Sequence, residues 1–465
     1  MARTARKKKS IWNLTDGFKG DKIILMVALL LMLISIIAVF SSTTLLATPG
    51  HDRVSIVREQ LIAVGLGLGV MAGCYFGIRR TGVFRFFSQF GFVFSLIFLV
   101  ILVFHIKTGI FTFPKNEVAR RVLEFHGKQI HVFEIVKVVM VMYVAWAVSQ
   151  FKEGKFTFFK EFAANNPSFK WVGTDLFLEW FYIFIPMAIT IGLVMMGSNS
   201  AALLIAGVLI LMCILGGIKF KHLLGFFAVL VVGGGIMVGV MLTTNKGRAA
   251  TALSRITNRD EANLEKLYET TPGTAAFYEV MDKLKQPISA EYAIKDGGVL
   301  GKFVGGSDQK YITAAIYEDY MYSFIVEETG LWGALLIIML YLSLLARGVM
   351  IVKDCGDNLF AKLAVAGLIL MICSQAMLHM AVNVHLPLMP QTGQTLPMIS
   401  HGSSAFLMFC LAFGIILSIS RNVWVKMQKR EADAIPIIEH SEENDPVQAG
   451  LDELEQLETL DKDEL

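Results

Sequence analysis

The chain has 465 residues, of which 55% are hydrophobic and only 17% are charged, and its mean hydropathy is +0.59. Soluble domains carry about 25% charged residues, so this composition excludes an ordinary soluble protein and predicts an integral membrane protein. The net charge of +3 gives no reason to expect a nucleic-acid partner. The five cysteines lack metal-ligand spacing, and we expect neither a disulfide nor a zinc site.

Apolar runs long enough to cross a bilayer recur along the chain. A span needs about 20 residues, because the hydrocarbon core is about 30 Å thick and a helix rises about 1.5 Å per residue. We predict an all-α polytopic membrane protein with about ten transmembrane helices. The predicted spans are residues 23–46, 61–77, 86–104, 130–150, 181–196, 201–217, 223–242, 321–345, 363–384 and 405–419.

The Lys and Arg residues of the short loops indicate the orientation, because cytoplasmic loops are enriched in them. The first residues are strongly basic, and basic residues recur in every second loop. We therefore expect both termini in the cytoplasm and the large loop between the seventh and eighth spans outside. The predicted parts are a basic cytoplasmic tail (1–22), a membrane domain (23–425) that includes the extracytoplasmic loop (243–318), and an acidic, disordered cytoplasmic tail (426–465).

Ionisable residues inside the predicted spans need an explanation, because charges are costly in a membrane. Glu134 and Lys137 lie three residues apart, so they share a helix face and can pair. One interpretation is a structural ion pair, and the other is a Lys137 that faces a polar cavity and binds an anionic substrate. Glu327 and Glu328 lie within about two turns of the outer end of the eighth span, where partial solvation would explain them.

Three arginines on the outer side are candidate anion-binding residues. Arg248 and Arg255 would share one face of a helix, and their planar guanidinium groups fit the oxygens of a diphosphate. Solvated loop arginines are the alternative interpretation. Arg121 lies just outside the fourth span, where basic residues are disfavoured, and an anionic ligand would explain it.

Five glycines within residues 297–306 predict a backbone with positive φ or close ligand approach. The segment lacks the Gly-Lys-Ser/Thr ending of a nucleotide-binding P-loop. Asp319 follows at the mouth of the eighth span, half in water and half against apolar groups, which would raise its pKa towards that of a general base. An acid stabilised by the helix dipole is the alternative.

These motifs resemble, in order, the signature blocks of the SEDS family (shape, elongation, division and sporulation). The run Gly297–Lys310 resembles G-G-x-x-G-x-G-x-G-x-S-x-Q-K/R, and Asp319–Gly330 resembles D-F-I-F/Y-x-x-x-x-E-E-x-G. Asn383 with residues 390–400 resembles N-x(6)-P-x-T-G-x-x-L-P-x-I-S, and the Glu134, Lys137 and arginine spacings also match. The resemblance covers about residues 20–425. It is closest to the division branch in its Bacteroidetes form, with the elongation branch second.

The resemblance implies a peptidoglycan glycosyltransferase that polymerises lipid II, the undecaprenyl-diphosphate-linked disaccharide peptide, at the outer face of the bacterial cytoplasmic membrane and at the division septum. It implies that Asp319 deprotonates the GlcNAc 4-hydroxyl of the acceptor and that the anomeric carbon inverts. The implied substrate-binding residues are Arg248, Arg255, Lys310, Lys137, Glu134, Arg121, Ser307, Gln309, Ser403 and Ser404.

The resemblance also implies partners, namely a class B penicillin-binding protein transpeptidase and other division proteins. We expect no protein metal site, although a divalent cation (Mg²⁺ or Mn²⁺) could neutralise the leaving group. Departures from the family pattern leave altered activity open: residues 312–314 are Ile-Thr-Ala, Glu318 precedes Asp319 where Ser or Thr is usual, His401 lies in the Ser400–Ala405 block, and residues 197–199 replace Pro-Asp.

Two other functions stay open on the sequence alone, a lipid II flippase or other transporter and a catalytically weak scaffold. A transporter would place charges near the bilayer midplane. Most of the unusual residues lie instead at the outer face, which favours the enzyme, whereas Glu134 and Lys137 keep the transporter open. Within the enzyme class, an elongation polymerase is the alternative to a division polymerase.

Overall fold

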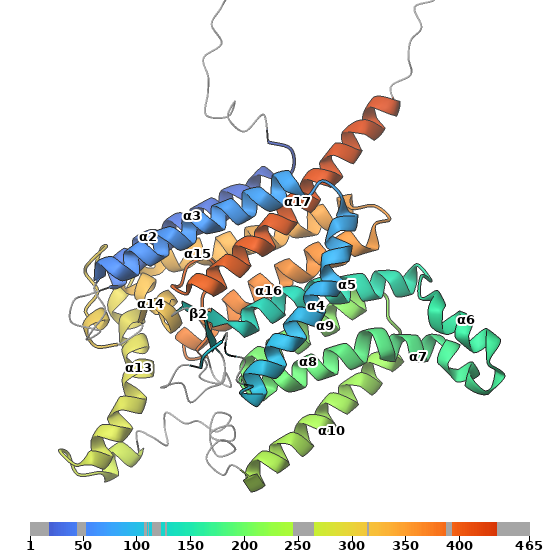
Figure 1. Ribbon diagram of the computed structural model, residues 1–465. Coiled ribbons are helices and arrows are strands. Elements are labelled where there is room, and N and C mark those ends of the chain that lie inside the picture. The colour runs from blue at the N-terminus through green and yellow to red at the C-terminus, as the bar shows by residue number, and fades with distance from the viewer. Residues whose placement is uncertain are drawn as a thin grey trace, which may run out of the picture. The chain divides into compact units, whose positions relative to one another are not determined.

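The computed structural model shows an α-helical protein that also contains a small β-hairpin (Figure 1). The structure describes residues 18–43, 53–106, 109, 111–113, 122–125, 128–244, 265–313, 316–386 and 393–434. The chain divides into two units, residues 1–423 and 424–465. The disorder predicted from residue 426 is wrong for residues 426–434, which belong to a helix that ends at Ala434. Residues 1–17 and 435–465 lie outside the described residues, so the disorder expected for the rest of the acidic tail stays a prediction.

Each predicted span coincides with a helix or with a pair of consecutive helices. These are α2 (Lys22–Ser42), α3 (Arg53–Gly77), α4 (Thr81–Phe104), α5 (Val132–Lys152), α7 (Asp175–Glu179) with α8 (Ile185–Met195), α9 (Asn199–Leu215), α10 (Phe220–Thr244), α15 (Met321–Asp354), α16 (Leu359–Asn383) and α17 (Ser403–Ala434). Among the described residues, eight spans are long and apolar enough to cross a membrane, and α9 and the 220–236 part of α10 are shorter apolar helices. The polytopic membrane fold is confirmed, and the exact number of crossings stays a prediction.

Local chemistry explains where several helices begin and bend. Asp21 begins α2, because its Oδ1 accepts hydrogen bonds from the backbone N–H groups of Ile23 and Ile24, both at 3.0 Å. Between α7 and α8, residues Trp180–Phe184 form a π-helical turn just before Pro186. Proline lacks an N–H and its ring crowds the carbonyl four residues earlier, so the wider turn has a steric reason.

The helices differ in how much of their surface other helices cover. Side chains of α4 such as Phe86, Phe87 and Phe94 are exposed, whereas α5, α16 and α17 are mostly buried. Apolar side chains at the surface are expected where lipid is the solvent. Because lipid is as apolar as these side chains, contacts between the helices depend on close packing and on hydrogen bonds.

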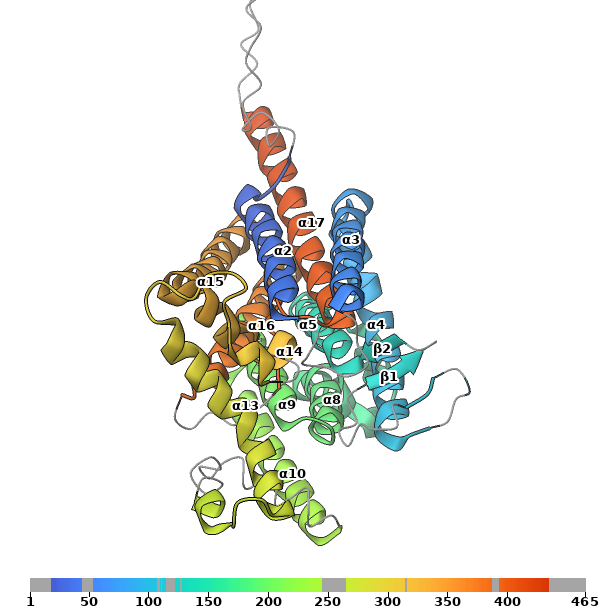
Figure 2. The same cartoon turned by 90° about the vertical axis from the view of Figure 1, so that its left-hand side faces the viewer.

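The predicted outer loop contains further helices, which gather with a β-hairpin at one end of the bundle (Figure 2). They are α13 (Ala275–Gly297), a 3₁₀ turn (Gln309–Tyr311) and α14 (Ile316–Asp319). The antiparallel hairpin is formed by β1 (Val122–Phe125) and β2 (Lys128–His131). Two elements follow α5 and precede α7, namely α6 (Thr157–Asn165) and a 3₁₀ helix (Pro167–Gly173).

The fourth span was predicted to begin near residue 130, and the helix begins two residues later. Ile130 and His131 belong to β2, where they pair with Leu123 and Val122. The helix begins at Val132. An apolar pattern cannot reveal this boundary, because the strand partner lies on the other side of a turn.

Candidate active site

The glycine-rich segment packs directly against the first turns of α15. A Cβ atom at Gly301 would overlap the carbonyl oxygen of Glu328, and one at Gly330 would overlap the carbonyl oxygen of Val299. Gly301 and Gly330 also have φ values of +76° and +67°, which side-chain-bearing residues rarely adopt. The expected positive φ values are therefore present, and Gly301 and Gly330 approach the backbone of the facing segment closely. Close approach of a ligand stays a prediction.

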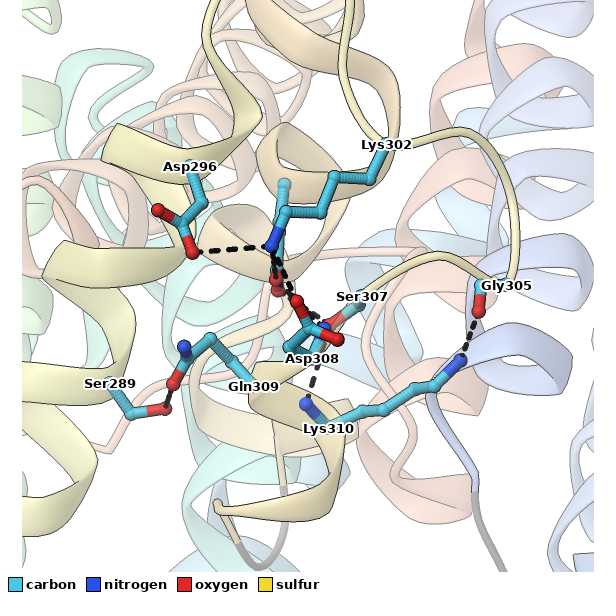
Figure 3. Close-up of polar contacts among 9 residues, drawn as sticks. Ser289, Asp296, Lys302, Gly305, Ser307, Asp308, Gln309 and Lys310 are labelled. Atoms are coloured by element: carbon cyan, nitrogen blue, oxygen red, sulfur yellow. Dashed lines mark hydrogen bonds and ion pairs between the residues drawn. The ribbon is translucent and has the colours of Figure 1, made fainter.

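Glu327 fixes this segment from inside the protein. Its side chain is fully buried, so the partial solvation expected from the sequence is wrong. Glu327 Oε2 accepts a hydrogen bond from Ser307 Oγ at 2.5 Å, and its Oε1 accepts from the Asp308 N–H at 2.9 Å and from Lys302 Nζ at 3.3 Å. Lys302 also reaches Asp296 at 3.2 Å and Asp308 at 2.7 Å (Figure 3). The buried carboxylate is thus satisfied by a segment about 20 residues earlier in the chain.

Glu328 is also buried, with 4% of its surface exposed, and the expected solvation is wrong here too. Its Oε1 accepts hydrogen bonds from Ser41 Oγ at 2.6 Å and from the Gly305 N–H at 2.8 Å. Lys310, a predicted diphosphate ligand, is 5% exposed, and its Nζ donates to the Gly305 carbonyl at 2.7 Å (Figure 3). Glu328 and Lys310 therefore fix the backbone N–H and the carbonyl group of Gly305, respectively. Diphosphate binding by Lys310 stays a prediction.

Two more of the predicted substrate-binding residues are buried in the same outer region. Ser307 is 1% exposed and donates its hydroxyl hydrogen to Glu327, as described above. Gln309 is 8% exposed, and its Oε1 accepts a hydrogen bond from Ser289 Oγ at 2.7 Å (Figure 3). These hydrogen bonds give both side chains a structural role in the fold of the outer loop.

Asp319 is the last residue of α14 and is half-buried, immediately before α15. Its carboxylate rests on Gly393, because a Cβ atom there would lie 2.5 Å from Oδ2 and 3.0 Å from Oδ1. Its carbonyl oxygen accepts a hydrogen bond from Asn383 Nδ2 at 3.2 Å. The structure therefore brings Asp319 together with Asn383, at the end of α16, and with Gly393, in the segment that follows α16. These three residues belong to separate sequence motifs.

We expect Gly393→Ala to displace the Asp319 carboxylate while the helices keep their packing. The added methyl group meets the end of a side chain rather than a backbone atom. A misplacement of about 1 Å can lower the rate of an enzyme by about 10²-fold. The measurement is polymerisation of labelled lipid II beside the melting temperature in detergent. An equal loss of activity and of folded protein would contradict this interpretation.

Glu318, which directly precedes Asp319, has a carboxyl group with a raised pKa. Burial and, to a smaller extent, the neighbouring negative charge of Asp319 together raise the pKa of its carboxyl group to about 7. The Glu318 carbonyl accepts a hydrogen bond from Ser400 Oγ at 2.7 Å. A carboxyl group with this pKa exists in both protonation states near neutral pH.

The raised pKa of Glu318 predicts a loss of stability as the pH rises. Folded protein holds this proton more tightly than unfolded protein, so raising the pH from about 4.5 to about 7 favours unfolding. Glu318→Gln has no such proton, so its melting temperature should fall less over the same interval. Thermal unfolding of both proteins in detergent at pH 5 and pH 8 provides the comparison. Parallel curves would show that the Glu318 pKa is not raised.

A stripe of polar residues on α16 holds the segment beside Asp319, and of these residues only Asn383 was predicted from the sequence motifs. Gln375, His379 and Asn383 lie four residues apart and are at most 1% exposed. Gln375 Nε2 donates to the Thr395 carbonyl at 3.1 Å, and His379 Nδ1 lies 2.6 Å from the Gln394 carbonyl. Polar residues at every fourth position of an apolar run were the available signal.

Lys137 lies inside the bundle rather than on a described cavity. It is 1% exposed, and its Nζ lies 2.6 Å from Glu134 Oε1 and 2.5 Å from Gln375 Oε1. These contacts favour the structural ion pair over the open polar cavity. The substrate-binding roles of Glu134 and Lys137 stay predictions.

A cavity of about 510 Å³ opens between α3, β2, α14 and the start of α17. One wall is apolar and belongs largely to α3. The polar lining residues are Glu59, Gln129, His131, Tyr317, Glu318, His401 and Ser403. Ser403 was predicted from the sequence, and the hydroxyl of its neighbour Ser404 accepts a hydrogen bond from the His131 N–H at 3.0 Å. Arg121, Arg248 and Arg255 lie outside the described residues.

Comparison with known proteins identifies the family. Residues 21–424 match the family model FTSW_RODA_SPOVE, described as "Cell cycle protein". A Geobacter metallireducens relative named "Probable peptidoglycan glycosyltransferase FtsW" is 25% identical over 411 residues, which cover 88% of this chain and 96% of the relative.

Two solved structures show the same fold. Thermus thermophilus rod shape determining protein RodA is similar with a TM-score of 0.54 at 16% identity, over 87% of this chain and 98% of that chain. A chain solved in a study of polymerization and crosslinking by a peptidoglycan synthase complex is similar with a TM-score of 0.56 at 16% identity, over the same shares. The resemblance read from the motifs is confirmed, and the chain belongs to the FTSW_RODA_SPOVE family of cell cycle proteins.

Proposed function

We propose that this multi-pass membrane protein is a peptidoglycan glycosyltransferase that polymerises lipid II at the outer face of the bacterial cytoplasmic membrane. The observation that carries the proposal is the position of Asp319, which lies between the end of α16 and Gly393 at the predicted extracytoplasmic end of the bundle. The activity in the name of the Geobacter metallireducens relative supports the same reaction.

In the proposed reaction, Asp319 accepts the proton of the GlcNAc 4-hydroxyl of the acceptor. The hydroxyl oxygen forms a bond with the anomeric carbon of the donor, and the bond between that carbon and the diphosphate oxygen breaks. Undecaprenyl diphosphate leaves with the electron pair, and attack from the opposite face inverts the anomeric carbon. Gly393 and Asn383 position Asp319, whose proton transfer would contribute about 10²- to 10⁴-fold to the rate.

The diphosphate needs positive charge, which Arg248, Arg255 and Lys310 are proposed to supply. Among the described residues, no three His, Cys, Asp or Glu side chains gather as a metal site. The proposed chemistry therefore assigns no step to a protein-bound Mg²⁺ or Mn²⁺. Participation of a divalent cation stays a prediction.

The proposed setting is the division septum, with a class B penicillin-binding protein transpeptidase and other division proteins as partners. The name of the Geobacter metallireducens relative supports the division branch, and the synthase complex that contains a similar chain supports a transpeptidase partner. The Bacteroidetes form stays a prediction.

The test is polymerisation of labelled lipid II by the purified full chain in detergent, with and without a class B penicillin-binding protein. A flippase or a scaffold forms no glycosidic bonds, so either would yield no polymer. We expect glycan chains from the wild type in the presence of its partner. Absence of polymer with a folded partner, together with lipid II transport in vesicles, would favour the flippase.

A further inference from the structure

A chain of hydrogen bonds fixes the tautomer of His401 at the cavity beside Glu318. Ser35 Oγ donates to the Ile399 carbonyl at 2.7 Å, so Ser35 accepts the hydrogen bond from Gln60 Nε2 at 2.7 Å. Gln60 Oε1 is then the acceptor that faces His401 Nδ1 at 3.0 Å. His401 must therefore carry its proton on Nδ1, because a carbonyl oxygen cannot donate.

The other ring nitrogen of His401 is left as an acceptor at the cavity. His401 is 9% exposed and lines the cavity. No hydrogen bond to its Nε2 comes from the described residues, and the nearest carboxylate atom, Glu59 Oε2, lies 3.9 Å away, which is too far for one. Burial lowers the pKa of His401, so its ring is neutral at pH 7 and Nε2 keeps its lone pair.

The rest of the polar lining is rich in acceptors and carries negative charge. Glu59 and Glu318 contribute carboxyl groups, and the described lining residues include no Lys or Arg. Such a cavity would repel a diphosphate. A primary ammonium group offers one positive charge and three N–H donors, which suits two carboxylates and an imidazole acceptor.

We propose that this cavity binds a primary ammonium group, which donates hydrogen bonds to His401 Nε2 and to the Glu59 carboxylate. The inference rests on the proposed function, because the ligand we assign is the ammonium on the diamino acid of the lipid II peptide stem. The ethanolamine headgroup of a phospholipid has the same chemistry and is the other source. The cavity therefore determines specificity for the stem and is distinct from the proton transfer at Asp319.

The charge of Glu318 makes this binding dependent on pH. The titratable groups around it are Asp319, Glu59, His131, His401 and Tyr317. Because the pKa of Glu318 is about 7, the cavity gains negative charge between pH 6 and pH 8, whereas a primary ammonium stays protonated. The KM for the free-amine substrate should therefore fall over this interval in the wild type and change less in Glu318→Gln.

The test compares lipid II carrying a free stem amine with lipid II acetylated at that amine. One charge-assisted hydrogen bond is worth about a factor of ten in affinity, so the wild type should show about a tenfold lower KM for the free amine at similar kcat. Glu59→Gln and His401→Phe should lose this preference but still polymerise both substrates. His401→Gln, which keeps an acceptor, should restore part of it. Glu291→Gln, an equal charge change on α13 outside the cavity, should keep the preference.

A binding measurement tests the ammonium site even if no polymer forms. Thermophoresis in phospholipid-free detergent measures the affinity of the full chain for each of the two lipids. Weaker binding of the acetylated lipid by the wild type, but not by Glu59→Gln, supports the ammonium site. Equal binding of both lipids by the wild type overturns it, while the proposed polymerase would stand if both are polymerised. Competition by phosphatidylethanolamine in nanodiscs, absent with phosphatidylglycerol, would support the site and assign the headgroup as its ligand.

Discussion

Replacing Asp319 with asparagine is expected to lower the rate of lipid II polymerisation by about 10²- to 10⁴-fold, because the amide cannot accept the acceptor's proton. The fold should survive the change. Asparagine has nearly the same shape, and the bond from Asn383 goes to the backbone carbonyl of residue 319 rather than to the side chain. Glycan chain formation and the melting temperature, measured on the same preparation, separate loss of chemistry from loss of structure.

The matched control for this experiment is Asp296→Asn, which makes the same chemical change in the outer loop, at the end of α13. It should leave the polymerisation rate within a few-fold of the wild type. Polymer formation by Asp319→Asn at the wild-type rate would remove Asp319 from the proposed role. Glu318 would then be the next candidate for the general base, because its pKa of about 7 suits that role.

Much of the fold follows from local sequence. Apolar length alone predicts the spans, because each transmembrane helix satisfies its own backbone hydrogen bonds and needs no distant partner to be recognised. The position of Asp319 at the mouth of α15 is also a local property, since it directly precedes the apolar run. The confirmed predictions, the polytopic helical membrane fold and the family, therefore rest on features that lie close together in the chain.

The contacts that give the site its shape join distant residues, and the sequence could not predict them. Lys137 meets Gln375, which lies 238 residues away, and His401 meets Gln60, which lies 341 residues away. The solvation expected for Glu327 was wrong for the same reason. A residue near the end of a membrane helix is exposed to water only if no other segment covers it. The glycine-rich segment covers Glu327.

Replacing Glu327 with alanine is expected to cause the largest loss of stability of the substitutions considered. The side chain is fully buried and accepts hydrogen bonds from Ser307, Asp308 and Lys302. Its removal leaves the Ser307 hydroxyl buried without its acceptor and Lys302 without its only buried carboxylate partner among the described residues. Breaking a buried charged network by removing one partner costs about 3–5 kcal/mol, and thermal unfolding in detergent measures the loss.

Asp296→Ala separates burial from charge in this experiment, because Asp296 is another carboxylate partner of Lys302 and its side chain is 43% exposed. Exposed ion pairs contribute about 0–1 kcal/mol, so this control should melt close to the wild type. Glu327→Gln should lie between the two, since the amide oxygen still accepts from the Asp308 N–H but cannot pair as an ion with Lys302. If Glu327→Ala melted like Asp296→Ala, the glycine-rich segment would be held on α15 by its close backbone contacts at Gly301 and Gly330, and the buried carboxylate would be dispensable for the fold.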